Sequence, residues 1–216
     1  MLTPKERILA AAVQVFGRKG FKAATVREIC QAARVNLAAL NYYFGNKQNL
    51  YRILVTDLLK SAIEHYPADM GRGRGADPRE RLRLFILALL HRLLAPGGLS
   101  GFQNQGRLLA RELADPSPVL DTLVQDHIRP QAAILSGIIT ELIGSDAPRE
   151  RVMRCAFSIM GQCFYYGYAW PIASRLCPMD PNDAGIIDAL ADHITEFSLR
   201  GLKGFKDGPA EGATHA

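Results

Sequence analysis

Small, polar and aromatic side chains gather between positions 36 and 47, and their types suit contacts with DNA. In this stretch Leu37, Leu40 and Phe44 recur at helical spacing, so the face that they share is predicted to pack inward. The residues left facing outward or along the flank are Ala38, Ala39, Asn41, Tyr42 and Tyr43. Asparagine pairs with adenine edges, alanine methyls touch the thymine methyl, and tyrosine hydroxyls donate to phosphates. The outward face has the chemistry of a DNA-reading surface, the alternative being that Tyr42 and Tyr43 are core aromatics.

Two short helices joined by a tight turn would carry this surface. Thr25 and Glu28 form a capping-box pattern that starts the first helix. Asn36 is a good N-cap for the second helix, which is predicted from 37 to 43. The turn between them falls at Arg34-Val35. A pair of this kind can place its second helix in the major groove of DNA.

The N-terminal quarter of the chain is basic. Residues 1–50 hold eight Lys/Arg and two acids, whereas the whole chain of 216 residues has a net charge of +5. Thr25 and Arg27 at one helix start, and Lys47 in the first turn of a helix capped by Asn46, lie where phosphates would bind. The charge split favours a nucleic-acid reader joined to a nearly neutral body. The alternative is a solvated basic face.

The rest of the chain is also predicted to be helical. A first helix starts at Thr3-Pro4 and ends at Gly20. Further helices are predicted from about 46 to 66, 79 to 94, 103 to 113, 119 to 143 with a kink or split at Pro130, 148 to about 168 before Pro171, and 183 to 202. No strand pattern of any length competes, so the fold class is all-α.

The sequence disfavours several other classes of protein. No run reaches about 18 consecutive apolar residues, and no secretory signal is recognisable, so no membrane association and a cytoplasmic location are expected. The four cysteines lie far apart and form no CxxC pair, as in a reduced protein. Motifs for phosphate loops, serine hydrolases and zinc proteases are missing, so neither catalysis nor a metal or cofactor is expected. The other alternative is a helical adaptor without sequence-specific DNA binding.

Residues 5–60 resemble the DNA-binding signature of the TetR family of bacterial transcriptional regulators. The resemblance rests on the run from Thr25-Val-Arg-Glu-Ile to Tyr42-Tyr-Phe-Gly-Asn-Lys47. It implies a helix-turn-helix domain at 1–50 and an effector-binding and dimerisation domain at 51–206, connected by the helix at about 46–66. It also implies a homodimer that binds a pseudo-palindromic operator in double-stranded DNA and a small-molecule effector. Residues 207–216 are expected to be a disordered tail.

The same resemblance implies roles for individual residues in the DNA-binding domain. Thr25, Arg27, Tyr42, Tyr43 and Lys47 would contact phosphates, and the segment Asn36, Leu37, Ala38, Ala39 and Asn41 would cap and carry the base-facing surface. One position departs from the family pattern, because Arg34 stands where the family usually has glycine. If Arg34 adopts a positive φ, its side chain adds strain of about 1 kcal/mol.

Short motifs in the body, such as Ile128-Arg-Pro130 and Ser158-Ile-Met-Gly-Gln-Cys163, are similar to a TetR subgroup that regulates sensitivity to cephalosporin and chloramphenicol. This similarity implies a repressor of efflux or drug-tolerance genes and of its own operon. The residues predicted to contact the effector are Phe102, Arg107, Arg111, Glu112, His127, Gln162, Tyr165, Tyr166 and Trp170. The alternatives are that Tyr166 and Trp170 are packing or dimer-interface aromatics and that His127 is an ordinary helix histidine. Arg107, Arg111 and Glu112 would then form a structural ion network.

The last two long helices each carry a broad apolar face. A twofold dimer would hide these faces and supply two DNA-reading heads. The predicted interface residues are Ile159, Phe164, Ile187, Leu190, Ile194 and Phe197. The alternative is that both faces serve only the core of one protomer.

Overall fold

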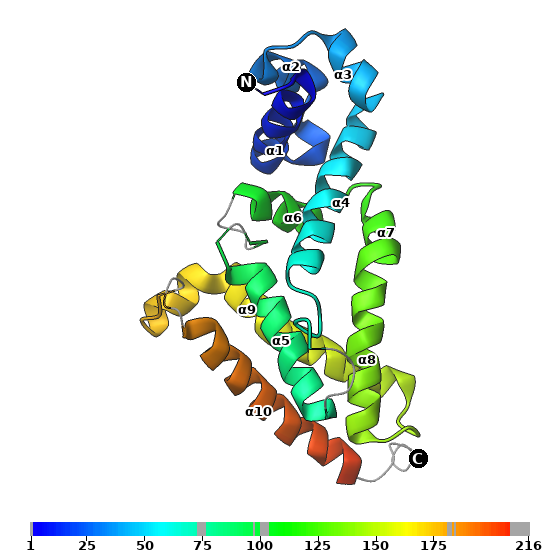
Figure 1. Ribbon diagram of the computed structural model, residues 1–216, viewed down its shortest axis with the longest axis vertical. Coiled ribbons are helices and arrows are strands. Elements are labelled where there is room, and N and C mark those ends of the chain that lie inside the picture. Colours follow the sequence, from blue (N-terminus) through cyan, green and yellow to red (C-terminus); the bar gives the residue numbers. More distant parts are fainter. Residues whose placement is uncertain are drawn as a thin grey trace, which may run out of the picture.

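The computed structural model describes residues 2–72, 77–96, 98–99, 104–180, 183 and 185–207. Its regular elements within these ranges are helical, which confirms the all-α prediction (Figure 1). The helices are α1 (Pro4–Ala23), α2 (Val26–Ala33), α3 (Leu37–Phe44), α4 (Lys47–His65), α5 (Pro78–Leu94), α6 (Asn104–Ala114), α7 (Leu120–Leu123), a π-helical turn η1 (Val124–Ile128), α8 (Arg129–Ile143), α9 (Arg149–Leu176) and α10 (Ile186–Asp207). None of the described helices is long and apolar enough to cross a membrane.

Helices α1 to α3 form a head at one end of the molecule, and α4 runs from this head into the body (Figure 1). Ile8, Phe16, Ile29 and Leu40 are completely buried in the head, in a core that is continuous with that of the body. Tyr51 of α4 reaches into this core, with its ring edge-on to that of Phe16 at a centroid distance of 4.8 Å. An aromatic pair of this geometry adds packing energy beyond the area that it buries.

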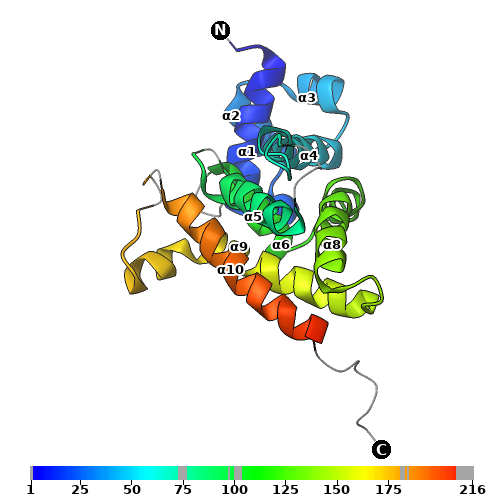
Figure 2. The same cartoon turned by 60° about the horizontal axis from the view of Figure 1, so that its bottom comes forward.

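Helix α5 lies at the centre of the body, where it packs against α8, α9 and α10 (Figure 2). Leu82 and every residue from Leu84 to Leu90 are buried, as expected for a helix that is apolar on nearly all sides. The contact with α9 is close at Gly167, because a Cβ atom there would lie 3.1 Å from the Leu93 side chain. A larger side chain at this position would push the two helices apart.

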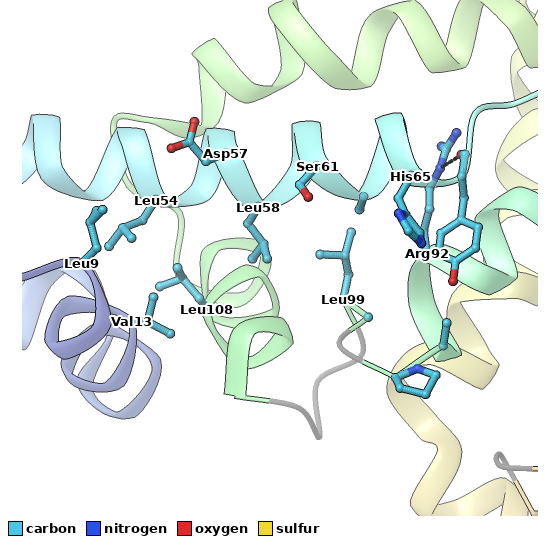
Figure 3. Close-up of a pocket in the computed structure, with 15 residues that line it drawn as sticks. Leu9, Val13, Leu54, Asp57, Leu58, Ser61, His65, Arg92, Leu99 and Leu108 are labelled. Carbon is cyan, nitrogen blue, oxygen red and sulfur yellow. Dashed lines mark hydrogen bonds between the residues drawn. The ribbon is translucent and has the colours of Figure 1, made fainter. Parts of the chain in front are cut away.

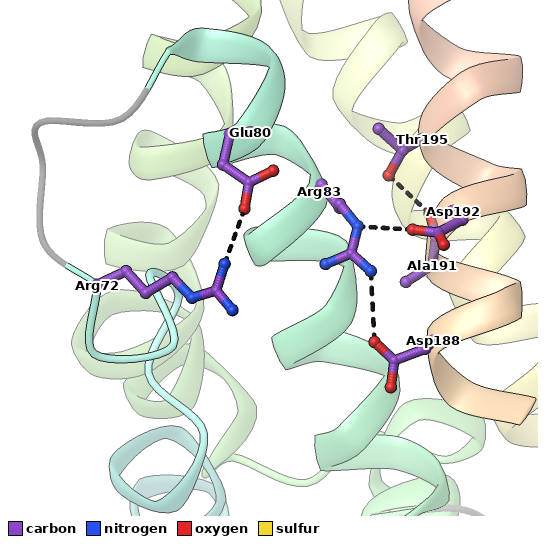
Figure 4. A network of polar contacts seen from close by, with 7 residues as sticks. All are labelled: Arg72, Glu80, Arg83, Asp188, Ala191, Asp192 and Thr195. Atoms are coloured by element: carbon purple, nitrogen blue, oxygen red, sulfur yellow. Dashed lines mark hydrogen bonds and ion pairs between the residues drawn. The ribbon is translucent and has the colours of Figure 1, made fainter. Parts of the chain in front are cut away.

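Ion pairs tie the outer surface of α5 to α10 (Figure 4). Arg83 donates to Asp192 at 2.5 Å and to Asp188 at 3.3 Å, so one guanidinium bridges two carboxylates on successive turns of α10. These acidic partners raise the pKa of Arg83. The arginine side chain is about a quarter exposed, so the two contacts orient α10 on α5 and contribute modestly to stability.

Two prolines disturb the helices in different ways. Pro130 follows η1, where the Arg129 N–H donates to the carbonyl of Val124, so a wider turn relieves the clash that a proline makes with the preceding turn. The predicted break at Pro130 is therefore a π-helical turn. The second proline, Pro171, lies inside α9 and does not end it. The predicted end near Tyr168 is therefore wrong, since α9 continues to Leu176 after a kink at Ala169, whose φ and ψ are −105° and 16°.

Other predicted boundaries shift by a few residues. Gly20 has a φ of 77° and leaves the helical conformation as predicted, but the chain resumes a helical turn and α1 extends to Ala23. Helix α10 begins at Ile186 and runs to Asp207, beyond the predicted end at 202. The rest of the predicted tail, 208–216, lies outside the described residues.

Candidate nucleic-acid interface

The helix-turn-helix begins with the predicted capping box. The backbone N–H of Glu28 donates to Thr25 Oγ1 at 3.3 Å, and Glu28 Oε2 accepts from the Thr25 N–H at 3.1 Å. Lys19 of α1 forms an ion pair with the same glutamate. The Lys19 ammonium, followed by the Thr25 donors, lowers the pKa of Glu28 to about 2. These contacts fix the start of α2 against α1.

Arg34 occupies the left-handed region, with a φ of 54° and a ψ of 49°. Around it the Val35 N–H donates to the carbonyl of Cys30 at 3.0 Å and the Arg34 N–H to that of Gln31 at 3.2 Å. This is the Schellman arrangement, which normally uses glycine at the left-handed position. The carbonyl of Arg34 also accepts from Arg7 Nη1 at 3.2 Å. The turn thus keeps the geometry expected for glycine, although arginine is strained there.

Helix α3 presents an unusually exposed face. Tyr42 is 83% exposed and Tyr43 is 39% exposed, so neither is a core aromatic. Ala38 and Asn41 are exposed beside them. On the opposite side Leu40 and Phe44 are buried as predicted. The exposed tyrosines beside small side chains match the outward face expected from the spacing.

Three residues at the edges of α3 behave differently from one another. Leu37 is 56% exposed, so its predicted inward packing is wrong, and the buried face of α3 begins one turn later at Leu40. Asn36 caps the helix, with Oδ1 accepting from the Ala39 N–H at 2.8 Å. That amide oxygen is therefore occupied. The half-buried Ala39 lies at the border of the exposed face.

Lys47 is held by the backbone of the head. Its ammonium donates to the carbonyls of Phe21 at 2.9 Å and Ala24 at 3.1 Å, and it lies 4.5 Å from the centre of the Phe21 ring. A third contact reaches the carbonyl of Lys22 at 3.5 Å. An ammonium has three N–H donors, and two of them are engaged by the two shorter contacts. In this arrangement Lys47 fastens α4 to the end of α1, and its predicted phosphate contact stays a prediction. Thr25 and Arg27, by contrast, are exposed.

Two residues predicted to contact an effector lie where the head meets the body. Arg111 of α6 donates to the carbonyls of Gly17 at 2.9 Å and Arg18 at 2.6 Å, both on α1. Its neighbour Glu112 is 1% exposed and accepts from the Tyr51 hydroxyl at 2.8 Å. Both side chains therefore have intramolecular partners. Their arrangement supports the alternative of a structural polar network that joins α6 to α1 and α4.

A cavity of about 490 Å³ extends along α4 (Figure 3). Leucines of α4 line it, together with side chains of α1 and α6, and Arg92 of α5 and His65 lie at the end away from the head (Figure 3). A second, smaller cavity of about 110 Å³ lies deeper in the body and also includes Arg92. Of the predicted effector contacts His127 lines the smaller cavity, as does Phe164, which was predicted for the dimer interface. Sequence reasoning missed Arg92, for which a charged residue within an apolar run was the available signal.

The other predicted effector contacts do not converge on one cavity. Gln162 lines a groove of about 320 Å³ between α9 and α10. Trp170 is buried, Tyr166 is half-buried, and Tyr165 is 47% exposed. Arg107 is exposed on α6. Phe102 lies outside the described residues.

Most of the predicted dimer residues are buried within one protomer. The exposed fractions are 3% for Ile159, 9% for Ile187, 6% for Leu190 and 1% for Ile194. The protomer core accounts for their apolar spacing, and their role in a dimer interface stays a prediction. Phe197 differs, being 63% exposed on the outer face of α10.

Comparisons with known proteins agree with this fold. A curated relative, the HTH-type transcriptional dual regulator CecR of Shigella flexneri, is 26% identical over 163 residues, which cover 73% of each chain. The structure of the transcriptional regulator FadR from Bacillus subtilis in complex with stearoyl-CoA is 22% identical, with a TM-score of 0.64 over 91% of this chain and 98% of that chain. The structure of AibR in complex with isovaleryl coenzyme A and operator DNA is 18% identical, with a TM-score of 0.63 over 90% of this chain and 97% of that one.

Two family models match consecutive parts of the sequence. Residues 8–53, which include α2 and α3, match the model for bacterial regulatory proteins of the tetR family. Residues 78–202 match the C-terminal domain of the HTH-type transcriptional dual regulator CecR. The second match alone covers more than half of the chain. The chain therefore belongs to the tetR family of bacterial transcriptional regulators and has a C-terminal domain of the CecR type.

Proposed function

We propose that this regulator is a homodimeric repressor that a small molecule releases from its operator. The observation that carries the proposal is the exposed face of α3, where Tyr42 stands 83% exposed on a helix capped at both ends. A short, fixed helix with small and hydrogen-bonding side chains outward suits the major groove. Arg27 and the other basic residues of the head would supply the phosphate contacts.

A twofold dimer is supported by apolar side chains on the outer faces of α9 and α10. Phe157 and Phe197 are each 63% exposed, and Phe205 is 46% exposed. Phe197 and Phe205 also line the groove between the two helices. Exposed phenylalanines clustered on neighbouring helices mark an association surface. A second copy of the chain would cover it and align two heads with the half-sites of a pseudo-palindrome.

Release by a ligand is supported by the position of the 490 Å³ cavity. Its lining comes from the body and from Leu9 and Val13 of the head. A ligand can shift the DNA-bound equilibrium only if it binds one arrangement of head and body more tightly than the other. A cavity shared by head and body meets this requirement, since a change in head orientation alters its walls. Binding of the ligand and of the operator would then oppose each other reciprocally.

The target genes are proposed to be efflux or drug-tolerance genes together with the regulator's own operon. This assignment rests on the resemblance of the short motifs in the body to the subgroup that regulates sensitivity to cephalosporin and chloramphenicol. A gel-shift experiment with the DNA upstream of the regulator's own gene tests it, with a scrambled fragment of equal length as the control. We expect a discrete complex that survives excess scrambled DNA. Failure to shift any upstream intergenic fragment more strongly than the scrambled one would refute the proposal.

The dimer is tested separately by sedimentation of the wild type and of Phe197→Glu. A charge at this exposed position should convert the dimer to a monomer without unfolding it, because the side chain contributes little to the protomer core. A wild type that sediments as a monomer would contradict the proposed assembly. The matched control is Leu176→Glu, at a position that is 78% exposed and lies beyond the groove of α9 and α10.

A further inference from the structure

Arg92 is the buried cation of the body. It is 5% exposed and lies on α5 among leucines, of which Leu90 is completely buried and Leu93 is 1% exposed. Burial of a charged group is costly unless the charge is paired. Burial lowers the pKa of Arg92 to about 10, so the guanidinium still carries its charge at neutral pH. Such a charge needs a compensating partner.

The partners of Arg92 are neutral. Its Nε donates to the main-chain carbonyl of Tyr66 at 2.8 Å, and its Nη1 donates to Gln131 Oε1 at 2.9 Å. Its Nη2 is buried and makes no hydrogen bond. Among the described residues no carboxylate forms an ion pair with this side chain. The guanidinium therefore keeps an unused donor group and an uncompensated charge.

Two cavities lie next to this charge. The smaller one is almost entirely apolar, whereas the larger one is lined by leucines and also by polar side chains, among them Ser61 and His65. The larger one continues from Arg92 along Leu54, Leu58, Leu99 and Leu108 to α1 (Figure 3). Asp57, its acidic lining residue, is exposed and lies toward the α1 end, away from Arg92 (Figure 3). At about 490 Å³ the cavity is within the range of small-molecule sites. A cation at one end of a cavity that continues along a row of leucines selects for a ligand with the complementary distribution of charge.

We infer that the effector is an amphipathic organic anion whose compact acidic head pairs with Arg92 and whose apolar body lies along α4. This rests on the proposed ligand response and names the class of its ligand. A carboxylate or phosphate head would accept hydrogen bonds from Nη2 and Nη1, the fork geometry that arginine offers to such groups, once the guanidinium turns its buried Nη2 toward the cavity. The anion would compensate the charge that Tyr66 and Gln131 leave unbalanced. The leucines of the cavity would contribute affinity through burial of the apolar body.

A purely structural role for Arg92 makes different predictions. If the side chain served only to hold Tyr66 and Gln131, replacing it would lower the melting temperature and leave ligand preference unchanged. If the charge awaits an anion, Arg92→Met removes an unpaired buried charge while keeping much of the side-chain volume. The unliganded variant should then melt at or above the temperature of the wild type. Ligand preference and unliganded stability together separate the two roles.

The experiment uses the full chain and measures binding by calorimetry and thermal shift. The probes are laurate, dodecyl phosphate, dodecanol and dodecylamine, which share one apolar chain and differ in the head. We expect both anions to bind the wild type at least about tenfold more tightly than the alcohol, and the amine most weakly, as charged hydrogen bonds are worth this much. Whichever anion binds more tightly identifies the head as carboxylate or phosphate. Arg92→Met should lose the preference, whereas Arg79→Met, at an exposed position on the same helix, should retain it.

Equal binding of the anions and the alcohol, no binding of any probe, or an anion preference that persists in Arg92→Met would overturn the inference. None of these results bears on DNA binding, which the gel shift measures without any probe. Conversely, absence of a DNA complex would leave the binding data interpretable. The two failures can therefore be told apart.

Discussion

The hydroxyl of Tyr51 donates to Glu112 Oε2 at 2.8 Å, joining α4 to α6 inside the interface between head and body. The other carboxylate oxygen of Glu112 accepts from the backbone N–H and the hydroxyl of Ser117, at 3.0 and 2.9 Å. Burial, followed by the contact with Glu112, raises the pKa of Tyr51 far above its ordinary value. The tyrosine therefore stays protonated and acts as a permanent donor to the carboxylate.

Replacement of Tyr51 by phenylalanine should destabilise the protein. The change leaves Glu112 Oε2 without its donor in a buried position, which costs about 1–3 kcal/mol. The free energy of unfolding from urea titration measures the loss. Tyr42→Phe is the control, because Tyr42 is 83% exposed, and it should be neutral. Equal stability of Tyr51→Phe and the wild type would show that the buried contact contributes nothing.

Replacement of Lys47 should affect the fold of the head more than its electrostatic contacts with DNA. Lys47→Met removes the donors that cap the carbonyls of Phe21 and Ala24, so the urea midpoint should fall. The slope of log affinity against log salt should remain within about half a unit of the wild-type slope. Arg27→Ala, at an exposed position, should reduce that slope by about one unit with little change in stability. A reduced slope in Lys47→Met with unchanged stability would support the phosphate role instead.

Replacement of Arg34 by glycine should stabilise the turn. A φ of 54° strains any side chain, and relief of that strain is worth about 1 kcal/mol, part of which the greater freedom of unfolded glycine offsets. Arg34→Ala keeps the backbone strain, so this variant should be no more stable than the wild type. Thermal unfolding of both variants checks the difference. A glycine variant that is no more stable than the alanine variant would mean that the left-handed backbone carries no strain here.

The pairing of Glu28 should make the head less stable in acid. The folded-state pKa, about 2, lies below the ordinary value of 4.5, so the folded state favours the charged carboxylate. This contribution is complete above about pH 4.5 and is lost as the pH falls toward 2. Glu28→Gln should lack this part of the acid dependence, which urea titrations at several pH values would reveal. Since the carboxylate is exposed, the difference should shrink in high salt. If the free energy of unfolding depends on pH in the same way in both proteins, the ion pair between Lys19 and Glu28 does not stabilise the head.

Local signals in the sequence predicted the head well, because each depends on neighbours a few residues apart. The capping boxes at Thr3 and Thr25 and the caps at Asn36 and Asn46 all form as expected. Leu37 was misplaced, since helical spacing gives the direction of a side chain and not how far the core extends. The contacts of Lys47 with main-chain carbonyls were not predicted, because these partners lie more than twenty residues away in the sequence.

The body was less predictable because its sites depend on which helices meet. Ile159 and Ile194 carry the apolar spacing of an interface, yet the protomer itself buries them. The residues around Arg92 come from α4, α5 and α8, and nothing in their separate spacings predicts that they converge. Pro171 predicted an end to α9 that a local kink makes unnecessary.

The most direct test of DNA recognition by α3 is fluorescence anisotropy of labelled upstream DNA with the wild type, Tyr42→Ala and Leu176→Ala. Both side chains are highly exposed, at 83% and 78%, so neither substitution should alter the fold. We predict that Tyr42→Ala weakens binding about tenfold, as the loss of a hydrogen bond to phosphate implies, and that Leu176→Ala binds like the wild type. If Tyr42→Ala binds this DNA as tightly as the wild type, the exposed face of α3 is not the surface that reads it.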